Sequence, residues 1–466
     1  MTSCFAARAT SATRPIVPLE ADGLSRWLKR QSSAVRAWVA AQGFTGNPGE
    51  VCLVPAPAGG LGQVLVGAAA ADALWSLADL PGRLPKGSYR LDARWGAAPA
   101  TSAALGWALG CYRFDRYKTV KRPAARLVWP KGADRAAVDR AAEATGLARD
   151  LINTPADDMG PPELAAAARH LARRHKARFS VITGDDLLKR GYPSVHAVGR
   201  AAAKPPRLID VTWGDKAAPK VTLVGKGVCF DTGGLDLKGA GNMKLMKKDM
   251  GGGAQVLGLA HMVMAAGLPV RLRVLVPAVE NNVAGNAMRP LDVLQTRKGL
   301  TVEVGNTDAE GRLILSDALA EADREKPELI VDCATLTGAA RVALGTEVPA
   351  VFCNHDGVAD ALLKHGVQQD DPLWRLPLWR PYRKSLDSRV ADICNISDGG
   401  YGGAITAALF LQAFVSDETP WIHIDMMGWN LRHRPGRPIG GEAMGMRALF
   451  ALIADRFGGT KTRAKR

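Results

Sequence analysis

From residue 221 onwards, short apolar runs alternate with longer segments in which apolar residues recur at helical spacing. The runs at 221–224, 270–279, 329–333 and 421–424 have the composition of buried strands, and those at 254–266, 313–325 and 405–414 have helical periodicity. This alternation predicts an α/β fold with a mostly parallel central sheet and helices on both faces. In such folds the chemistry gathers at the carboxyl ends of the strands.

The length of 466 residues is enough for more than one domain. A basic segment at 117–131, which contains Pro123 and Pro130, has the composition of a linker. We therefore predict two domains: a small amino-terminal α/β domain at 1–128 and a larger carboxy-terminal α/β/α domain at 129–466.

Composition restricts where such a chain can work. The most apolar long run, 66–77, is interrupted by Asp72, so we expect no membrane-spanning segment. The seven cysteines are scattered and form no CxxC pair, which favours a reducing compartment and a cytoplasmic location. The net charge of +16 is spread along the chain, apart from a basic end at Lys461, Arg463, Lys465 and Arg466 that we expect to be solvated.

The segment Asn306-Thr-Asp308-Ala-Glu310-Gly-Arg312 places two carboxylates and a guanidinium in seven residues. Val302 and Val304 alternate with polar residues as in a strand, whereas the apolar residues from 313 onwards follow helical spacing. The acidic pair is thus expected on a turn at the end of a strand.

A second set of charged residues follows the predicted strand at 221–224. It comprises Lys226, Asp231, Lys238 and Asp249, the last preceded by Lys247 and Lys248. With Asp308 and Glu310, four carboxylates would meet at one edge of the sheet, where they repel one another unless cations neutralise them. Two divalent ions would balance them; salt bridges to the nearby lysines are the alternative.

Other chemistries lack their motifs. The eight histidines show no HxxxH or HxH spacing, so a histidine-rich zinc site is not expected. The Gly-Lys pair at 225–226 lacks the remaining residues of a phosphate-binding loop, and no GxSxG is present. Oxygen ligands suit Mn²⁺, Mg²⁺ or a carboxylate-bound Zn²⁺, so the residues leave the metal open.

The chain resembles the leucyl aminopeptidase (cytosol aminopeptidase) family of dinuclear metallo-exopeptidases. The resemblance is carried by NTDAEGR at 306–312, RDLINTP at 149–155, VGKG at 224–227, FDTGG at 230–234 and DCATLTG at 332–338. It covers roughly residues 145–430. The first 128 residues match the family poorly, and only part of the Gly-rich segment at 440–447 follows its pattern.

The resemblance implies a role for each site residue. The metal ligands would be Lys226, Asp231, Asp249, Asp308 and Glu310, with Asp231 and Glu310 bridging two ions. Lys238 would stabilise the oxyanion of the tetrahedral intermediate, and Arg312 would hold a bicarbonate that acts as the general base. Met246, Thr335, Leu336 and Gly338 would contact the substrate.

The same resemblance implies the reaction and the partners. We expect removal of amino-terminal, leucine-like residues from peptides with a free amino terminus, and assembly into a homohexamer. A DNA-binding side role is the alternative from another class, since some similar proteins bind DNA, but no recognition motif in the sequence supports it.

Overall fold

The computed structural model describes residues 4–119 and 124–459. The chain forms two compact units, Met1–Gly146 with Arg432–Ile439 and Leu147–Leu431 with Gly440–Arg466. The basic residues at 461–466 lie outside the described part, so the expectation of a solvated end is not addressed by it.

The first unit is built on a six-stranded sheet with the order β1-β6-β5-β2-β4-β3, parallel except for the pair β3 and β4. Its strands are β1 (Phe5–Ala6), β2 (Arg14–Leu19), β3 (Val51–Pro55), β4 (Leu61–Gly67), β5 (Gly87–Leu91) and β6 (Ala125–Val128). The helices are α1 (Ala21–Leu28), α2 (Ser33–Ala41), α3 (Ala73–Ser76), α4 (Leu80–Arg83) and α5 (Ala97–Gly110). Ile16, Tyr89 and Trp107 are fully buried in its core.

The predicted linker at 117–131 is only partly correct. Residues 120–123 lie outside the described part, but Ala125–Val128 forms strand β6, which pairs with β1 and β5. The strand is four residues long and lies between two prolines in the sequence, so its strand pattern is too short to stand out. Helix α6 (Arg135–Asn153) follows, as predicted for residues 134–152.

The second unit contains the predicted central sheet, with the order β16-β15-β18-β14-β9-β11-β8-β7 and β10 added beside β11. Its strands are β7 (Arg178–Thr183), β8 (Arg207–Trp213), β9 (Lys220–Gly225), β10 (Gly227–Asp231), β11 (Arg271–Asn281), β14 (Leu329–Ala334), β15 (Ala350–Cys353), β16 (Trp374–Arg375) and β18 (Trp421–Asp425). Most pairs are parallel; β15 with β18, β8 with β11 and β7 with β8 are antiparallel.

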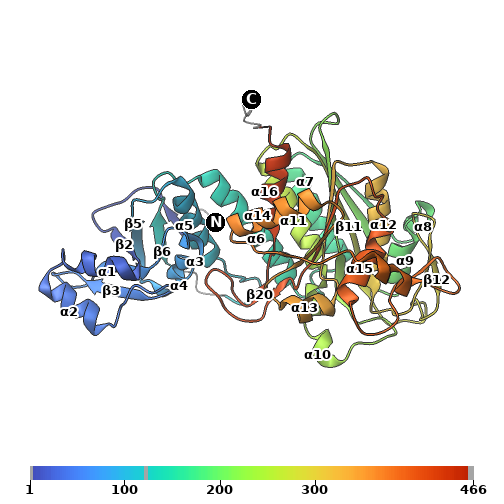
Figure 1. The fold of residues 1–466 in the computed structure, drawn as a ribbon, viewed down its shortest axis with the longest axis horizontal. Helices are drawn as coiled ribbons and strands as arrows, with labels where there is room; N and C mark the ends of the chain where they lie inside the picture. The colour runs from blue at the N-terminus through green and yellow to red at the C-terminus, as the bar shows by residue number, and fades with distance from the viewer. Residues whose placement is uncertain (1–3, 120–123, 460–466) are drawn as a thin grey trace. The chain divides into compact units, whose positions relative to one another are not determined.

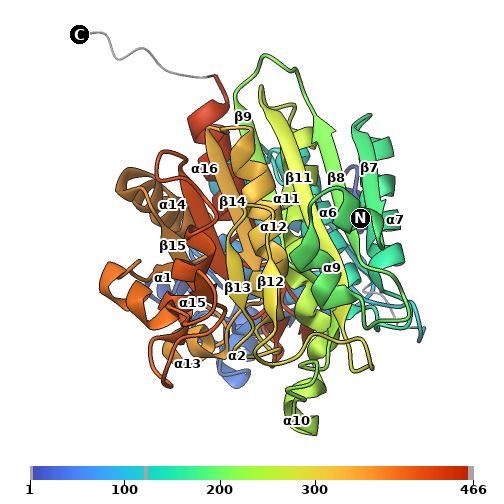
Figure 2. The same ribbon diagram turned by 90° about the vertical axis from the view of Figure 1, so that its right-hand side faces the viewer.

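Helices cover both faces of this sheet, which confirms the predicted α/β architecture. Figures 1 and 2 show α9, α12 and α15 on one side of β11, and α7, α11, α14 and α16 on the other. The bounds are α7 (Pro161–Arg174), α8 (Asp186–Lys189), α9 (Pro193–Gly199), α10 (Ala240–Met243), η2 (Met246–Met250), α11 (Gly251–Ala265), α12 (Glu310–Arg324), α13 (Gly338–Leu344), α14 (Asp356–Gln368), η3 (Arg380–Leu386), α15 (Gly403–Gln412) and α16 (Met446–Phe457). Strands β14 and β18 are buried along their whole length, as expected between two helical layers.

The segment at 306–312 differs from its prediction in one respect. The strand before it, β13 (Thr301–Glu303), belongs to a separate three-stranded sheet with β12 (Val293–Gln295) and β17 (Ile393–Cys394), not to the central sheet. A period of two predicts a strand but not the sheet that the strand joins. Glu310 is also the first residue of α12, rather than part of the turn.

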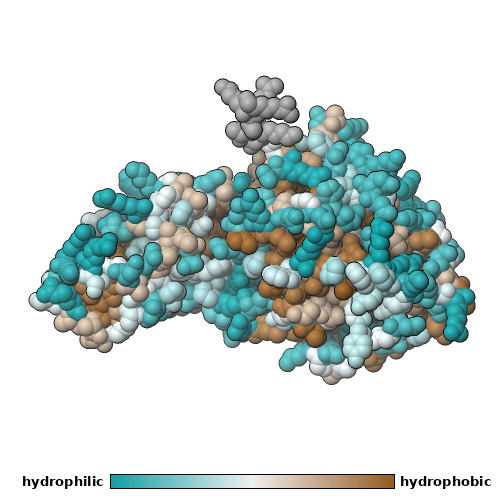
Figure 3. Space-filling model, viewed as in Figure 1, coloured by the Kyte–Doolittle hydropathy of each residue, from teal (hydrophilic) through white to brown (hydrophobic). Residues whose placement is uncertain are grey.

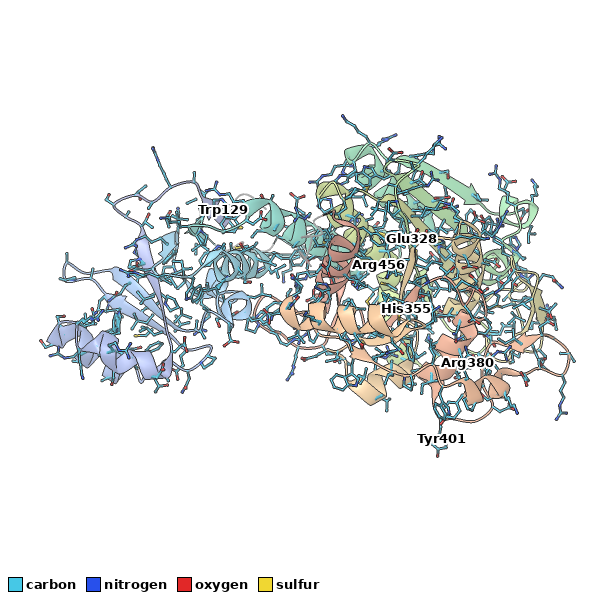
Figure 4. The ribbon with its side chains drawn as sticks, turned by 45° about the horizontal axis from the view of Figure 1, so that its top comes forward. Trp129, Glu328, His355, Arg380, Tyr401 and Arg456 are labelled. Atoms are coloured by element: carbon cyan, nitrogen blue, oxygen red, sulfur yellow. The ribbon has the colours of Figure 1, made fainter. Side chains whose placement is uncertain are left out.

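Two further features complete the second unit. A short ribbon pairs β19 (Trp429–Asn430) with β20 (Gly440–Gly441). Arg456 of α16 donates a hydrogen bond of 3.3 Å to the carbonyl oxygen of Glu328, just before β14, and Figure 4 labels both residues.

In the described ranges no helix is both long and apolar enough to cross a membrane. Figure 3 shows hydrophobic residues on the visible face broken up by hydrophilic ones.

Candidate active site

The structure brings the five predicted metal ligands together from four places in the second unit. Lys226 lies between β9 and β10, Asp231 ends β10, Asp249 belongs to η2, Asp308 precedes α12, and Glu310 begins it. One oxygen each of Asp231, Asp308 and Glu310 lies within 4.8 Å of the others. The carboxyl end of β10 and the start of α12 thus converge, although their segments are far apart in sequence.

Lys226 is almost completely enclosed, with 3% of its side chain exposed. Its Nζ lies 2.7 Å from Asp249 Oδ2 and 2.8 Å from Glu310 Oε1, and donates a 3.1 Å hydrogen bond to the carbonyl oxygen of Thr335. Burial lowers the pKa of Lys226, but Asp249, Glu310 and Asp231 outweigh burial and hold the pKa above its usual value.

Lys238 connects the other two carboxylates. Its Nζ lies 2.8 Å from Asp231 Oδ2 and also contacts Asp308 Oδ1. Burial opposes the charge, but the two carboxylates raise the pKa of Lys238 to about 12. The two lysines thus form ion pairs with all four acids, as the salt-bridge alternative describes.

The carboxylates nevertheless carry more negative charge than their surroundings compensate. Burial and then Asp231 raise the pKa of Glu310 to about 8, and the same two causes raise the pKa of Asp308. Asp249 Oδ2, Asp308 Oδ1 and Glu310 Oε1 are buried, and each contacts one lysine ammonium group. Oxygens of this kind, this close together, fit divalent cations.

Neutral side chains hold the cluster in place. Asn281, at the end of β11, donates from Nδ2 to Asp231 Oδ1 at 2.9 Å and to the carbonyl oxygen of Thr307 at 3.1 Å. Thr307 Oγ1 donates to the Gly233 carbonyl oxygen at 2.6 Å, and the Thr307 N–H donates to Asp236 Oδ2 at 2.7 Å. These bonds fasten the loop after β10 to the loop before α12.

Arg312 lies two residues after Glu310 in α12 and is buried. Its Nη1 donates to the carbonyl oxygen of Asn395 at 2.7 Å, while its Nε has no hydrogen-bond partner in the described ranges. Burial lowers the pKa of Arg312 to about 10, although Glu310 and Asp425 act in the opposite direction. Asn395 also accepts from the Gly305 N–H at 2.7 Å, so it supports the same loop.

The predicted substrate-contacting segment follows β14. Thr335 Oγ1 donates to Asp249 Oδ1 at 2.7 Å. Asp425 Oδ1 accepts from the N–H groups of Leu336 and Thr337, at 3.0 and 3.1 Å, and so fixes the turn that leads into Gly338 and α13. Met246 is 9% exposed, at the start of η2.

These residues surround a cavity of about 830 Å³ in the second unit. The predicted site residues that line it are Lys226, Asp231, Lys238, Met246, Asp249, Asp308, Arg312, Thr335, Leu336 and Gly338; Glu310 lies beneath it. The remaining wall includes Lys248, Arg341 and Met427. Three of the four carboxylates, those of Asp231, Asp249 and Asp308, thus line one cavity.

Sequence reasoning did not assign Asn281, Asn395, Asp425 and Lys248. The first three are single polar residues at strand ends or in loops, and nothing in their spacing separates them from ordinary turn residues. Lys248 stands in the noted Lys-Lys-Asp run; its burial, which lowers its pKa to about 8, depends on tertiary packing.

Comparison with known proteins agrees with this geometry. A model of the catalytic domain of the cytosol aminopeptidase family matches residues 146–450, and a model of the M17 aminopeptidase N-terminal domain matches residues 14–130. The probable cytosol aminopeptidase of Roseiflexus castenholzii is 41% identical over 378 residues, which are 77% of this chain and 77% of the relative.

Two solved structures extend the comparison to the whole fold. The cytosol aminopeptidase of Coxiella burnetii has a TM-score of 0.94 at 49% identity, covering 97% of this chain and 99% of the other. The bottromycin maturation enzyme BotP in complex with Mn has a TM-score of 0.87 at 36% identity, covering 96% and 100%.

Fold and comparisons together define a peptide-bond hydrolase. The chain belongs to the cytosol aminopeptidase family and is an aminopeptidase. The expectation that its first 128 residues match the family poorly is wrong, because the amino-terminal model covers most of them. That match extends the resemblance beyond the motifs, all of which lie after residue 145.

Proposed function

We propose that this aminopeptidase is metal-dependent and holds two divalent ions in the cavity between β10, η2 and the start of α12. The carrying observation is the convergence of Asp231, Asp308 and Glu310 within 4.8 Å. Together with Asp249 they are four carboxylates, and among the described residues they form ion pairs with two lysines, Lys226 and Lys238, so negative charge is left for divalent cations to balance. The Mn complex of the related BotP supports a metal of this class.

In this proposal Lys226, Asp231, Asp249, Asp308 and Glu310 would hold the ions. The ions would supply an activated water and polarise the first peptide carbonyl. Lys226 must lose its proton to become a ligand, because its ammonium group now pairs with Asp249 and Glu310. Mn²⁺ and Zn²⁺ both suit this donor set, and Mg²⁺ is a further candidate.

Two basic residues complete the proposed chemistry. Lys238, already beside Asp231 and Asp308, would donate to the oxyanion that forms at the carbonyl. Arg312 would hold a bicarbonate as the general base, which its buried position and available Nε favour. Thr335, Leu336 and Gly338 would align the peptide main chain, and Met246 would contact the first side chain.

The substrate, the location and the oligomeric state are also proposals. Peptides with a free amino terminus would be the substrates, because the ions would bind the α-amine. A leucine-like first residue, a cytoplasmic location and a homohexamer follow from the family resemblance. DNA binding is not proposed, since neither the comparisons nor the described residues favour it.

Hydrolysis of a leucine chromogenic amide tests the proposal. We expect a chelator to reduce kcat/KM by at least about 100-fold and added Mn²⁺ to restore it, because the carboxylates alone cannot activate water. Asp308→Ala should cause a comparable loss that Mn²⁺ does not restore. Asp360→Ala, on the exposed face of α14, is the matched control and should keep its activity. Activity that survives both the chelator and Asp308→Ala would refute the two-metal proposal.

A further inference from the structure

Lys248 is a buried lysine in the cavity wall whose side chain is not used by the proposed chemistry. It is 1% exposed and lines the cavity from η2, next to Asp249. Within the described part of the chain, the structure records no ion pair and no hydrogen bond for its ammonium group. Burying an ammonium without a counter-ion costs folding free energy.

The neighbouring lysines differ from Lys248 in this respect. Lys226 and Lys238 each pair with two carboxylates. Lys247 donates to the carbonyl oxygen of Asn153 at 2.6 Å, and its Nζ lies 5.5 Å from the centre of the Trp429 ring. Of these four lysines, only Lys248 both lines the cavity and forms no ion pair or hydrogen bond with the described residues.

The acids near Lys248 are engaged elsewhere. Asp249 accepts from Thr335 through Oδ1 and pairs with Lys226 through Oδ2. Asp425 accepts two main-chain N–H groups through Oδ1 and the Thr337 hydroxyl, at 2.6 Å, through Oδ2. Neither lies within ion-pair distance of Lys248, so neither of these acids pairs directly with its ammonium group.

A second cation lies on the same wall. Arg341 of α13 lines the cavity and forms no ion pair with a carboxylate among the described residues. Its Nη1 lies 3.4 Å from the sulfur of Met427, another wall residue. The two cations and the thioethers of Met246 and Met427 form a wall with an apolar part and a positive part.

We propose that the Lys248 wall (Met246, Lys248, Arg341 and Met427) binds the side chain of the substrate's first residue. On this proposal it selects an acidic residue, glutamate or aspartate, in place of the leucine-like residue that the family resemblance implies. The inference rests on the proposed function, in which the α-amine is anchored at the ions held by Asp249. Lys248 lines the same cavity as Asp249, so a first side chain would extend from that anchor along the wall that contains Lys248. The methylene groups of glutamate would pack on the two methionines, and its carboxylate would supply the missing counter-ion.

The test is the ratio of kcat/KM for the glutamyl and the glutaminyl amide of one chromogenic amine, with the Mn-loaded enzyme. The two substrates differ in charge and hardly in shape. We expect a ratio of at least about ten, because a site with a buried unpaired charge discriminates against the neutral analogue. Lys248→Met, which keeps the length of the side chain, should bring the ratio close to one, and Lys248→Arg should retain most of it.

Lys247→Met is the matched control, since it removes the same charge from the neighbouring position outside the cavity wall, and its ratio should stay high. A ratio near one in the unaltered enzyme, or an unchanged ratio in Lys248→Met, would overturn the proposal.

A last pair of substrates, leucylglycine and leucylglycinamide, tests whether Lys248 binds the carboxylate of the first side chain or that of the peptide's carboxyl terminus. If Lys248→Met slows only the free acid, Lys248 serves the carboxyl terminus and the assignment to the first side chain is wrong.

The same measurements distinguish this proposal from the one it rests on. Hydrolysis of the leucyl amide without preference for the glutamyl amide contradicts only the role of the Lys248 wall. Failure of the unaltered, metal-loaded enzyme to hydrolyse any of the amides contradicts the proposed function itself.

Discussion

At the scale of single residues, Asn281 shows how an uncharged side chain can control a charged site. The Nδ2 of Asn281 donates hydrogen bonds both to Asp231 Oδ1 and to the carbonyl oxygen of Thr307. The residue is 2% exposed. Asn281→Ala removes both bonds and leaves two buried acceptors with fewer donors. We expect Mn²⁺ affinity, measured by isothermal titration calorimetry, to fall about 10- to 100-fold, because residues that orient metal ligands have effects of that size.

Asn282→Ala provides the control for this prediction. Asn282 is the next residue along, and its Nδ2 bonds to Glu280 at 3.3 Å instead of to the site. Its Mn²⁺ affinity should match that of the unaltered chain. Equal affinity of the two variants would mean that Asn281 does not position Asp231.

At the scale of elements, the first turn of α12 packs directly against Lys226. A Cβ at Gly311 would lie 2.6 Å from Cε and 2.7 Å from Nζ of Lys226. Gly311→Ala therefore forces Lys226 away from Glu310, even though alanine favours helix. We expect the Mn²⁺ concentration that gives half-maximal activity, the midpoint of activation, to rise by about tenfold or more, as for other losses of ligand positioning.

Gly241→Ala, in α10, is the control. A Cβ there would meet nothing within 4 Å, so the midpoint of activation of this variant should not change. The same midpoint in both variants would contradict the packing argument.

The elements also show which parts of the site the sequence could predict. The buried strands β9, β14 and β18 could be predicted because each is an apolar run. The charged residues of the cluster could be selected because they stand close together in sequence, in the segment that follows β9 and in the one that leads into α12. Asn281 and Asp425 are single polar residues whose roles depend on which strand ends meet. The membership of β13 in a separate sheet, and the pairing of β6 with β1 and β5, depend on long-range pairing that local periodicity does not encode.

At the scale of the whole molecule, the cluster couples folding to pH and to metal. In the metal-free fold the pKa of Glu310 rises from 4.5 to about 8, so the folded protein retains a proton that the unfolded chain loses. The stability from this proton is fully present below about pH 4.5 and is lost as the pH rises towards about 8. The raised pKa of Lys226 acts in the same sense at higher pH.

Divalent ions should reverse this trend, because they need the deprotonated forms of Glu310 and Lys226 and so compete with protons. We expect the Tm increase produced by a fixed concentration of free Mn²⁺ to be larger at pH 8 than at pH 5.5. Each tenfold gain in affinity adds about 1.4 kcal/mol to the free energy of unfolding when the site is near saturation. Differential scanning fluorimetry across this range, with chelator-treated protein in the same buffers as the baseline, measures the difference. A Mn²⁺-induced shift of the same size at both pH values would show that the ions do not displace protons from the cluster, and would argue against Lys226 and Glu310 as ligands.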